Sequence, residues 1–178
     1  MKYWLNGGTA ALMALATWRL WHDPTLPAVW AFVFGGALLS VVDWKHHLLP
    51  RKWVYYTLAG VLAGLLFAAT VSGEWVSFGT ALLGGLLLAN AFAVIYFLSY
   101  RVLGVKIIGY GDVRLAGVLG ALLGWYGLPY LITGMVAATF VALPFAAVKL
   151  WQTRKFTVNM AFGPPLMLGT LIVILAHA

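Results

Sequence analysis

The stretch VSFGTALLGGLLLANAFAVIYFLS, residues 76–99, contains no charged residue. An α-helix needs about 20 consecutive apolar residues to cross the roughly 30 Å hydrocarbon core of a bilayer. The stretch is long enough, so it predicts a transmembrane helix. The rest of the chain has the same character, since 63% of its 178 residues are hydrophobic and 8% are charged. A soluble domain carries about 25% charged residues. The composition therefore predicts an integral membrane protein.

Similar apolar runs lie on both sides of this stretch. We expect seven transmembrane helices, which gives an all-α, polytopic membrane bundle. Residues 1–178 are expected to form one domain, because the runs leave no room for a soluble one. The first run has the features of a signal peptide, but six more runs follow it, so we expect it to be retained as a helix. The expected spans are 4–21, 27–42, 53–72, 76–99, 113–126, 129–150 and 161–177.

Glycines occur in pairs or at four-residue spacing within these runs. Small residues at such positions let transmembrane helices approach closely. We therefore expect a packing role for Gly60 and Gly64, Gly84 and Gly85, and Gly120 and Gly124.

The charged residues alternate between the two sides of the predicted bundle. The turns at 22–26 and 73–75 hold Asp23 and Glu74, whereas the basic residues gather in the opposite loops. The positive-inside rule places those basic loops in the cytoplasm. This orientation explains the net charge of +7, and no nucleic-acid partner is expected. The predicted cytoplasmic segments are the N-terminus and residues 43–52, 100–112 and 151–160.

Asp43 and Asp112 both adjoin apolar spans on the predicted cytoplasmic side. Counted from Tyr126, Asp112 lies about 21 Å inward along a helix, and Asp43 lies about 24 Å inward from Pro27. Both carboxyls should therefore sit at similar depths, just below the cytoplasmic edge of the hydrocarbon core. Carboxylates inside a membrane are costly and usually mark a functional site. We expect the two to face each other.

Two facing carboxyls predict a specific chemistry. Repulsion and desolvation would leave the pair sharing one proton near neutral pH. The ionised member can then take a proton from water while the protonated member polarises a peptide carbonyl, which is the chemistry of an aspartic protease. Gly109 and Gly111 leave room for a backbone beside Asp112 and allow unusual dihedral angles, so we expect them to support the site.

A structural role for the same residues is equally compatible with their spacing. Asp112 could cap the fifth helix, where the helix dipole favours a negative charge. Asp43 could be a helix-end residue paired with Lys45 or Arg51.

Three segments resemble the type IV prepilin peptidases, a family of membrane aspartic proteases. GYGDVRLAGVLGALLGW, residues 109–125, resembles their GxGD signature. VVDWKHHLLPRKW, residues 41–53, resembles a second signature, in which an aspartate at the end of a span precedes a polar stretch, an aliphatic residue and a proline. AFGPPLMLG, residues 161–169, resembles the segment that opens the final helix of the family. The three segments follow one another in the family's order.

The resemblance implies that Asp43 and Asp112 are the catalytic pair and that no cofactor or metal is needed. It implies a prepilin or pseudopilin precursor as substrate, cut at the cytoplasmic face after a glycine that precedes its hydrophobic helix. The protein would then be a multi-pass protein of the cytoplasmic membrane of a bacterium or archaeon, with its active site facing the cytoplasm. Arg114 stands where the family usually has lysine.

Many relatives also carry a cysteine-rich domain associated with N-methylation of the mature pilin. This chain has no cysteine and only residues 1–3 before its first predicted span. It therefore resembles the peptidase-only branch of the family, and methylation is not expected.

Other functions remain open from the residues alone. A small ion- or proton-coupled transporter could use Asp43 and Asp112 as a relay, and a non-catalytic pilus assembly factor would not need them. Presenilin-like proteases share GxGD but carry a Pro-Ala-Leu motif, where this chain has GPPLM at 163–167. A metal site at the adjacent His46 and His47 would need further ligands, and the other histidines, His22 and His177, map to the opposite side. We therefore interpret His46 and His47 as interfacial residues.

The segment 100–111, YRVLGVKIIGYG, is apolar but interrupted by basic residues and glycines. We expect it to be a mobile interfacial loop that admits a substrate helix to Asp112.

Overall fold

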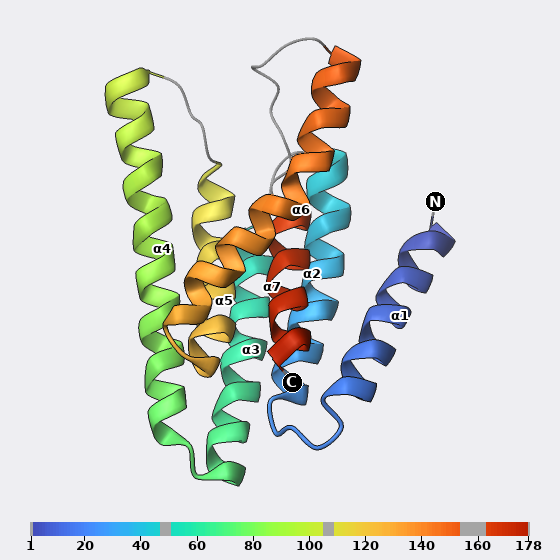
Figure 1. Ribbon diagram of the computed structural model, residues 1–178, viewed down its shortest axis with the longest axis vertical. Helices are drawn as coiled ribbons and strands as arrows, with labels where there is room; N and C mark the ends of the chain where they lie inside the picture. Colours follow the sequence, from blue (N-terminus) through green and yellow to red (C-terminus); the bar gives the residue numbers. More distant parts are fainter. Residues whose placement is uncertain (1, 47–50, 105–108, 154–162, 178) are drawn as a thin grey trace.

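A computed structural model describes residues 2–46, 51–104, 109–153 and 163–177. Within these ranges the chain forms seven α-helices and no strand. Successive helices run in alternating directions along the long axis of the bundle (Figure 1). The helices are α1 (Lys2–Arg19), α2 (Leu26–His46), α3 (Arg51–Ser72), α4 (Trp75–Leu103), α5 (Tyr110–Tyr126), α6 (Pro129–Thr153) and α7 (Gly163–His177).

The seven predicted helices are confirmed, but several of them extend beyond their predicted ends. The segment 100–111 was predicted as a loop, and this is wrong at both of its ends. Residues 100–103 complete α4, which stops at Gly104 in the left-handed conformation (φ 66°), because nothing before that glycine breaks the helix. Tyr110 and Gly111 already belong to α5. Residues 105–108, the middle of the predicted loop, lie outside the described residues.

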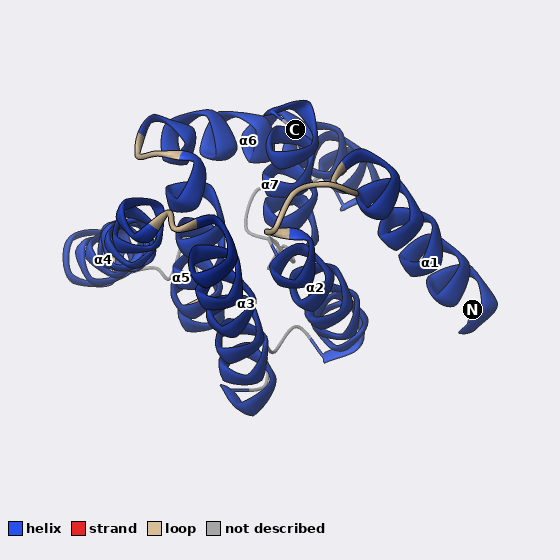
Figure 2. Cartoon of the chain, turned by 90° about the horizontal axis from the view of Figure 1, so that it is seen from below, coloured by secondary structure: helices blue, strands red, loops and turns tan. Residues whose placement is uncertain are grey.

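Helix α5 lies at the centre of the bundle. It contacts α3, α4, α6 and α7, and Figure 2 shows it between α4 and α3 with α6 alongside. Most of its side chains are consequently buried, from Asp112 near its first turn to Trp125 near its last. Any polar group on this helix is thus removed from water on most sides.

Glycines bring α4 and α5 into backbone contact. A Cβ atom added at Gly84 would lie 2.5 Å from the carbonyl oxygen of Gly120, and one at Gly124 would lie 2.6 Å from the carbonyl oxygen of Thr80. Only residues without side chains allow this approach. On α3, a Cβ atom added at Gly64 would likewise lie 2.5 Å from the backbone nitrogen of Ala28. The predicted packing role of these glycines is confirmed.

The outward faces of the bundle are apolar. On α4, Leu83, Leu86, Val94 and Phe97 are each more than half exposed. In the described part of the chain, two helical segments are long and apolar enough to cross a bilayer, Lys52–Ser72 and Trp75–Val102. Shorter apolar helical segments cover Leu26–Leu39, Pro129–Pro144 and Gly163–His177.

Candidate active site

Asp112 lies in the first turn of α5. Its Oδ2 atom accepts a hydrogen bond from the backbone N–H of Gly109 at 3.3 Å, and its own N–H donates to the Gly109 carbonyl at 3.0 Å. Gly109, not Asp112, is therefore the N-cap residue, and Asp112 is the third residue of the helix. The alternative in which Asp112 is itself the cap is therefore wrong in its position, although the carboxylate still stabilises the helix start from the third residue. It is also 7% exposed, which is costly for a carboxylate.

The glycines beside Asp112 matter because they lack side chains, and not because they adopt unusual dihedral angles. Gly109 is extended (φ −73°, ψ 145°) and Gly111 is helical, so the expectation of unusual dihedral angles is wrong. A Cβ atom added at Gly109 would lie 3.2 Å from the Oδ2 atom of Asp112. Because residue 109 has no side chain, the Asp112 carboxylate is not crowded from that side.

Asp43 lies in the last turn of α2, three residues before that helix ends at His46. Its side chain lies outside the described part of the chain, so the pairing of Asp43 with Asp112 stays a prediction. Figure 1 shows that α2 ends and α5 begins at the same end of the bundle. We call this the Asp112 end.

A contact at the opposite end links the turn before α2 to the end of α5. The hydroxyls of Thr25, just before α2, and Tyr126, the last residue of α5, lie 3.0 Å apart. From this contact, Asp112 is about 21 Å along α5 and Asp43 about 27 Å along α2, at a rise of about 1.5 Å per residue. Measured along their own helices, the two aspartates therefore lie at distances from this contact that differ by about 6 Å.

Asp23 and Glu74 have ordinary structural roles at the end opposite Asp112. The Oδ1 atom of Asp23 accepts hydrogen bonds from the N–H (2.8 Å) and the hydroxyl (2.7 Å) of Thr25. Glu74 accepts one from the Ser77 hydroxyl at 3.0 Å. Both acids line a polar cavity of about 600 Å³ that also includes His22 and His177. The histidines thus lie on the side where the sequence placed them.

The described residues do not test the roles of His46 and His47. The side chain of His46 and all of His47 lie outside the described residues, so their interfacial role stays a prediction.

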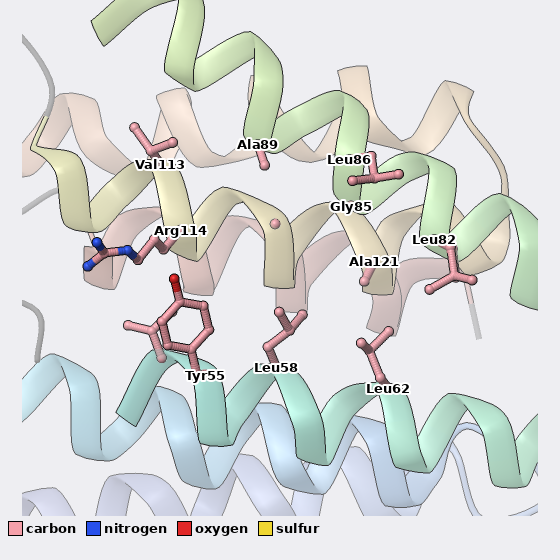
Figure 3. Close-up of a pocket in the computed structure, with 13 residues that line it drawn as sticks. Tyr55, Leu58, Leu62, Leu82, Gly85, Leu86, Ala89, Val113, Arg114 and Ala121 are labelled. Atoms are coloured by element: carbon pink, nitrogen blue, oxygen red, sulfur yellow. The ribbon is translucent and has the colours of Figure 1, made fainter. Parts of the chain in front are cut away.

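One feature that the sequence interpretation missed is an apolar groove between α3 and α4, which we call the lateral groove. Its volume is about 310 Å³, and Figure 3 shows side chains from α3, α4 and α5 converging on it. The signal available in the sequence was the four-residue repeat of Val113, Gly117 and Ala121 on α5. The lining of the lateral groove includes Tyr55 and Leu58 of α3, Leu82 and Ala89 of α4, and Arg114 and Gly117 of α5.

Arg114 lies at the Asp112 end of the lateral groove. Its guanidinium carbon is 4.5 Å from the centre of the Tyr110 ring and 5.8 Å from that of Tyr55. Tyr110 in turn packs edge-on against Tyr96, with the ring centres 5.6 Å apart. Aromatic faces attract a cation, so the guanidinium is held at the edge of the groove.

Sequence comparisons show which known proteins this chain is similar to. Residues 30–150 match the type IV leader peptidase family. The chain is 33% identical to leader peptidase HopD of Escherichia coli over 153 residues, which is 85% of this chain and 94% of that protein. It is 34% identical over 133 residues to a prepilin leader peptidase/N-methyltransferase of Pectobacterium carotovorum subsp. carotovorum, which is 74% of this chain and 45% of that protein.

A third relative extends the match to nearly the whole chain. The prepilin leader peptidase/N-methyltransferase of Pseudomonas putida is 30% identical over 174 residues, which is 94% of this chain and 56% of that protein. The chain thus spans about half the length of these two bifunctionally named relatives but nearly all of HopD. No solved structure matches the chain.

Proposed function

The chain belongs to the type IV leader peptidase family, and from this premise we propose that it is a membrane-embedded aspartic endopeptidase. Its substrates would be prepilin or pseudopilin precursors, whose short leader it removes at the cytoplasmic face after a glycine preceding the hydrophobic helix. In this proposal residues 1–178 form one peptidase domain that cleaves precursors, and no methyltransferase activity is assigned to it. Family membership does not favour the transporter or the assembly-factor alternative.

The observation that carries the proposal is the burial of Asp112. Asp112 is 7% exposed at the start of the central helix, whereas at the opposite end Asp23 is half-buried and Glu74 is exposed. A buried carboxyl in a membrane helix is costly and usually marks a functional site. Asp43 is proposed as the partner because α2 ends and α5 begins at the same end of the bundle (Figure 1), and both aspartates lie near those helix ends.

The proposed mechanism assigns the two carboxyls complementary tasks. One, ionised, removes a proton from a water molecule, and that water attacks the carbonyl carbon of the scissile peptide bond. The other, protonated, donates a hydrogen bond to the carbonyl oxygen and stabilises the negative charge that develops there. Collapse of the tetrahedral intermediate with protonation of the amide nitrogen then releases the leader.

The proposal places the bundle in the cytoplasmic membrane with the Asp112 end facing the cytoplasm. Support comes from the apolar outward faces and from the exposed basic residues Lys52 and Arg101, which belong to the Asp112 ends of α3 and α4. Cysteines introduced at positions 74 and 47 test the orientation. A membrane-impermeant maleimide should label position 74 in intact cells and position 47 only after permeabilisation, and the reverse pattern would overturn the orientation.

The direct test of function is co-expression with candidate prepilins from the same genome. Mass spectrometry should show each cognate precursor losing a short leader in the presence of the parent protein. Asp112→Asn should leave the precursor uncut, while Glu74→Gln should process it normally. Ion flux through the purified protein, together with uncut precursors, would favour the transporter instead.

A further inference from the structure

The lateral groove and the catalytic carboxyl occupy different faces of α5. The groove is lined by Val113, Gly117 and Ala121, which recur every four residues and so share one face. Asp112 does not line it, because at about 100° per residue it is turned away from the side of α5 that bears Val113, Arg114 and Gly117. A precursor lying in the groove would therefore not have its cleavage site directly at the Asp112 carboxyl. We infer that the groove binds a ligand other than the precursor.

The chemistry of the groove changes along its length. Its wall is made of aliphatic side chains, including Leu58, Leu82 and Leu86, and of the bare backbone at Gly85 and Gly117. Arg114 and Tyr55 lie at its end near the start of α5, so a charged group borders the otherwise apolar groove there (Figure 3). A ligand that fits must be apolar along most of its length and anionic at one end.

Arg114 is held in place for such a ligand. The Tyr110 and Tyr55 rings flank its guanidinium, while its N–H groups can still bind oxygen atoms in a bidentate manner. Two further exposed cations belong to the same ends of the other groove helices, Lys52 in the first turn of α3 and Arg101 in the last turn of α4. All three helices that line the groove thus carry a basic residue toward the Asp112 end of the bundle.

We propose that the lateral groove is a binding site for an anionic phospholipid. One acyl chain lies along the groove, and the phosphate meets Arg114 at the cytoplasmic interface, with Lys52 and Arg101 adding to the positive potential. Basic pockets between transmembrane helices on the cytoplasmic side bind such head groups. The inference goes beyond peptide cleavage and needs only the membrane embedding of the proposed function.

Lipid retention by the full-length protein tests the charged end of the site. Protein in a mild detergent is titrated with phosphatidylglycerol or with phosphatidylcholine carrying the same acyl chains, and bound lipids are counted by native mass spectrometry. Arg114→Gln should weaken phosphatidylglycerol binding about fivefold, the contribution of one cation near a membrane surface. It should leave phosphatidylcholine binding unchanged. Arg114→Lys should keep the preference, and Arg19→Gln at the opposite end should not alter it.

A matched pair of substitutions tests the apolar part of the site. Ala89→Leu fills the groove, whereas Ala91→Leu makes the same change on an exposed part of α4 outside it. The first should lower retention of both lipids and the second should not. If Ala89→Leu fails to fold, Leu82→Trp with Leu83→Trp as its control makes the same comparison, since Leu82 lines the groove and Leu83 does not.

Three results would overturn the proposal. One is equal phosphatidylglycerol retention by the parent, Arg114→Gln and the groove-filling variants. A second is that inorganic phosphate stabilises the protein against unfolding as much as phosphatidylglycerol does, since the charge of the head group alone would then account for binding. The third is a groove-filling variant that loses precursor cleavage but retains lipid, which would assign the groove to the precursor. Because the lipid count uses no precursor, it does not depend on whether the protein is a peptidase.

Discussion

The two ends of the helix bundle use their acidic residues differently. At one end, Asp23 bonds the backbone and hydroxyl of Thr25, whose hydroxyl in turn meets Tyr126. At the other end, Asp112 is buried at the start of the central helix, and a glycine beside it leaves its carboxylate room. The first arrangement joins helices, and the second keeps a costly group in a confined place. This difference supports the proposal that cleavage takes place at the Asp112 end.

The largest effect is expected from asparagine substitutions at the Asp112 end. Asp43→Asn and Asp112→Asn should each lower precursor cleavage by about 10³-fold or more, because neither carboxyl can perform the other's task. The double variant should be no worse than either single one, as expected of groups that act as a unit. Cleavage is followed by the mass of a co-expressed precursor.

Protein stability should not fall in these variants. The amide oxygen of asparagine can still accept the hydrogen bond from Gly109, and a buried charge is removed. Thermal unfolding in detergent checks this. Processing near the parent rate by either single variant would reduce the aspartates to helix-end residues.

Helix packing in the middle of the bundle should be the next most sensitive feature. A Cβ atom at Gly120 would overlap the carbonyl oxygen of Gly84, whereas one at Gly117 would lie 3.6 Å from the Ala89 Cβ atom, an ordinary contact. Gly120→Ala should therefore lower the free energy of unfolding by about 1–3 kcal/mol. Gly117→Ala should be neutral or slightly stabilising. Equal unfolding temperatures for the two variants would contradict the close contact of α4 and α5.

A smaller effect on cleavage is expected at Gly109. Its dihedral angles are accessible to any residue, so Gly109→Val should fold normally. The added side chain would press on the Asp112 carboxylate, and a displacement of about 1 Å should cost tenfold or more in cleavage rate. Gly79→Val is the control, since a Cβ atom there meets nothing within 4 Å. Full activity of Gly109→Val would remove the basis for a supporting role of Gly109.

The smallest effect is expected at the end opposite Asp112. Asp23→Ala removes the acceptor for two hydrogen bonds from Thr25, so the free energy of unfolding should fall by about 1 kcal/mol. Asp23→Asn keeps an acceptor oxygen and should cost less. Neither variant should change cleavage per folded molecule. A loss of cleavage in Asp23→Asn comparable with that in Asp112→Asn would erase the distinction between the two ends.

Much of the site followed from local sequence. The GxGD segment at 109–112 and the segment around Asp43 indicated the family, which the match over residues 30–150 confirms. Asp112 was expected at a helix start near one end of the bundle, and it lies there. The prediction of a loop at 100–111 is wrong at both ends, because a basic residue does not by itself end a helix. A helix continues through Arg101, however, until a residue such as Gly104 stops it.

The sequence by itself determined the helices and their glycine-bearing faces, because hydropathy, charge and small residues act over one or two helical turns. The tertiary structure alone decided that α5 is the central helix, that Gly84 meets Gly120, and that Thr25 meets Tyr126. It also placed Tyr55 of α3 beside Arg114 of α5 at one end of the lateral groove. These contacts join residues far apart in the chain, and every apolar helix offers several faces of similar hydrophobicity. Packing, rather than local preference, therefore selects among them.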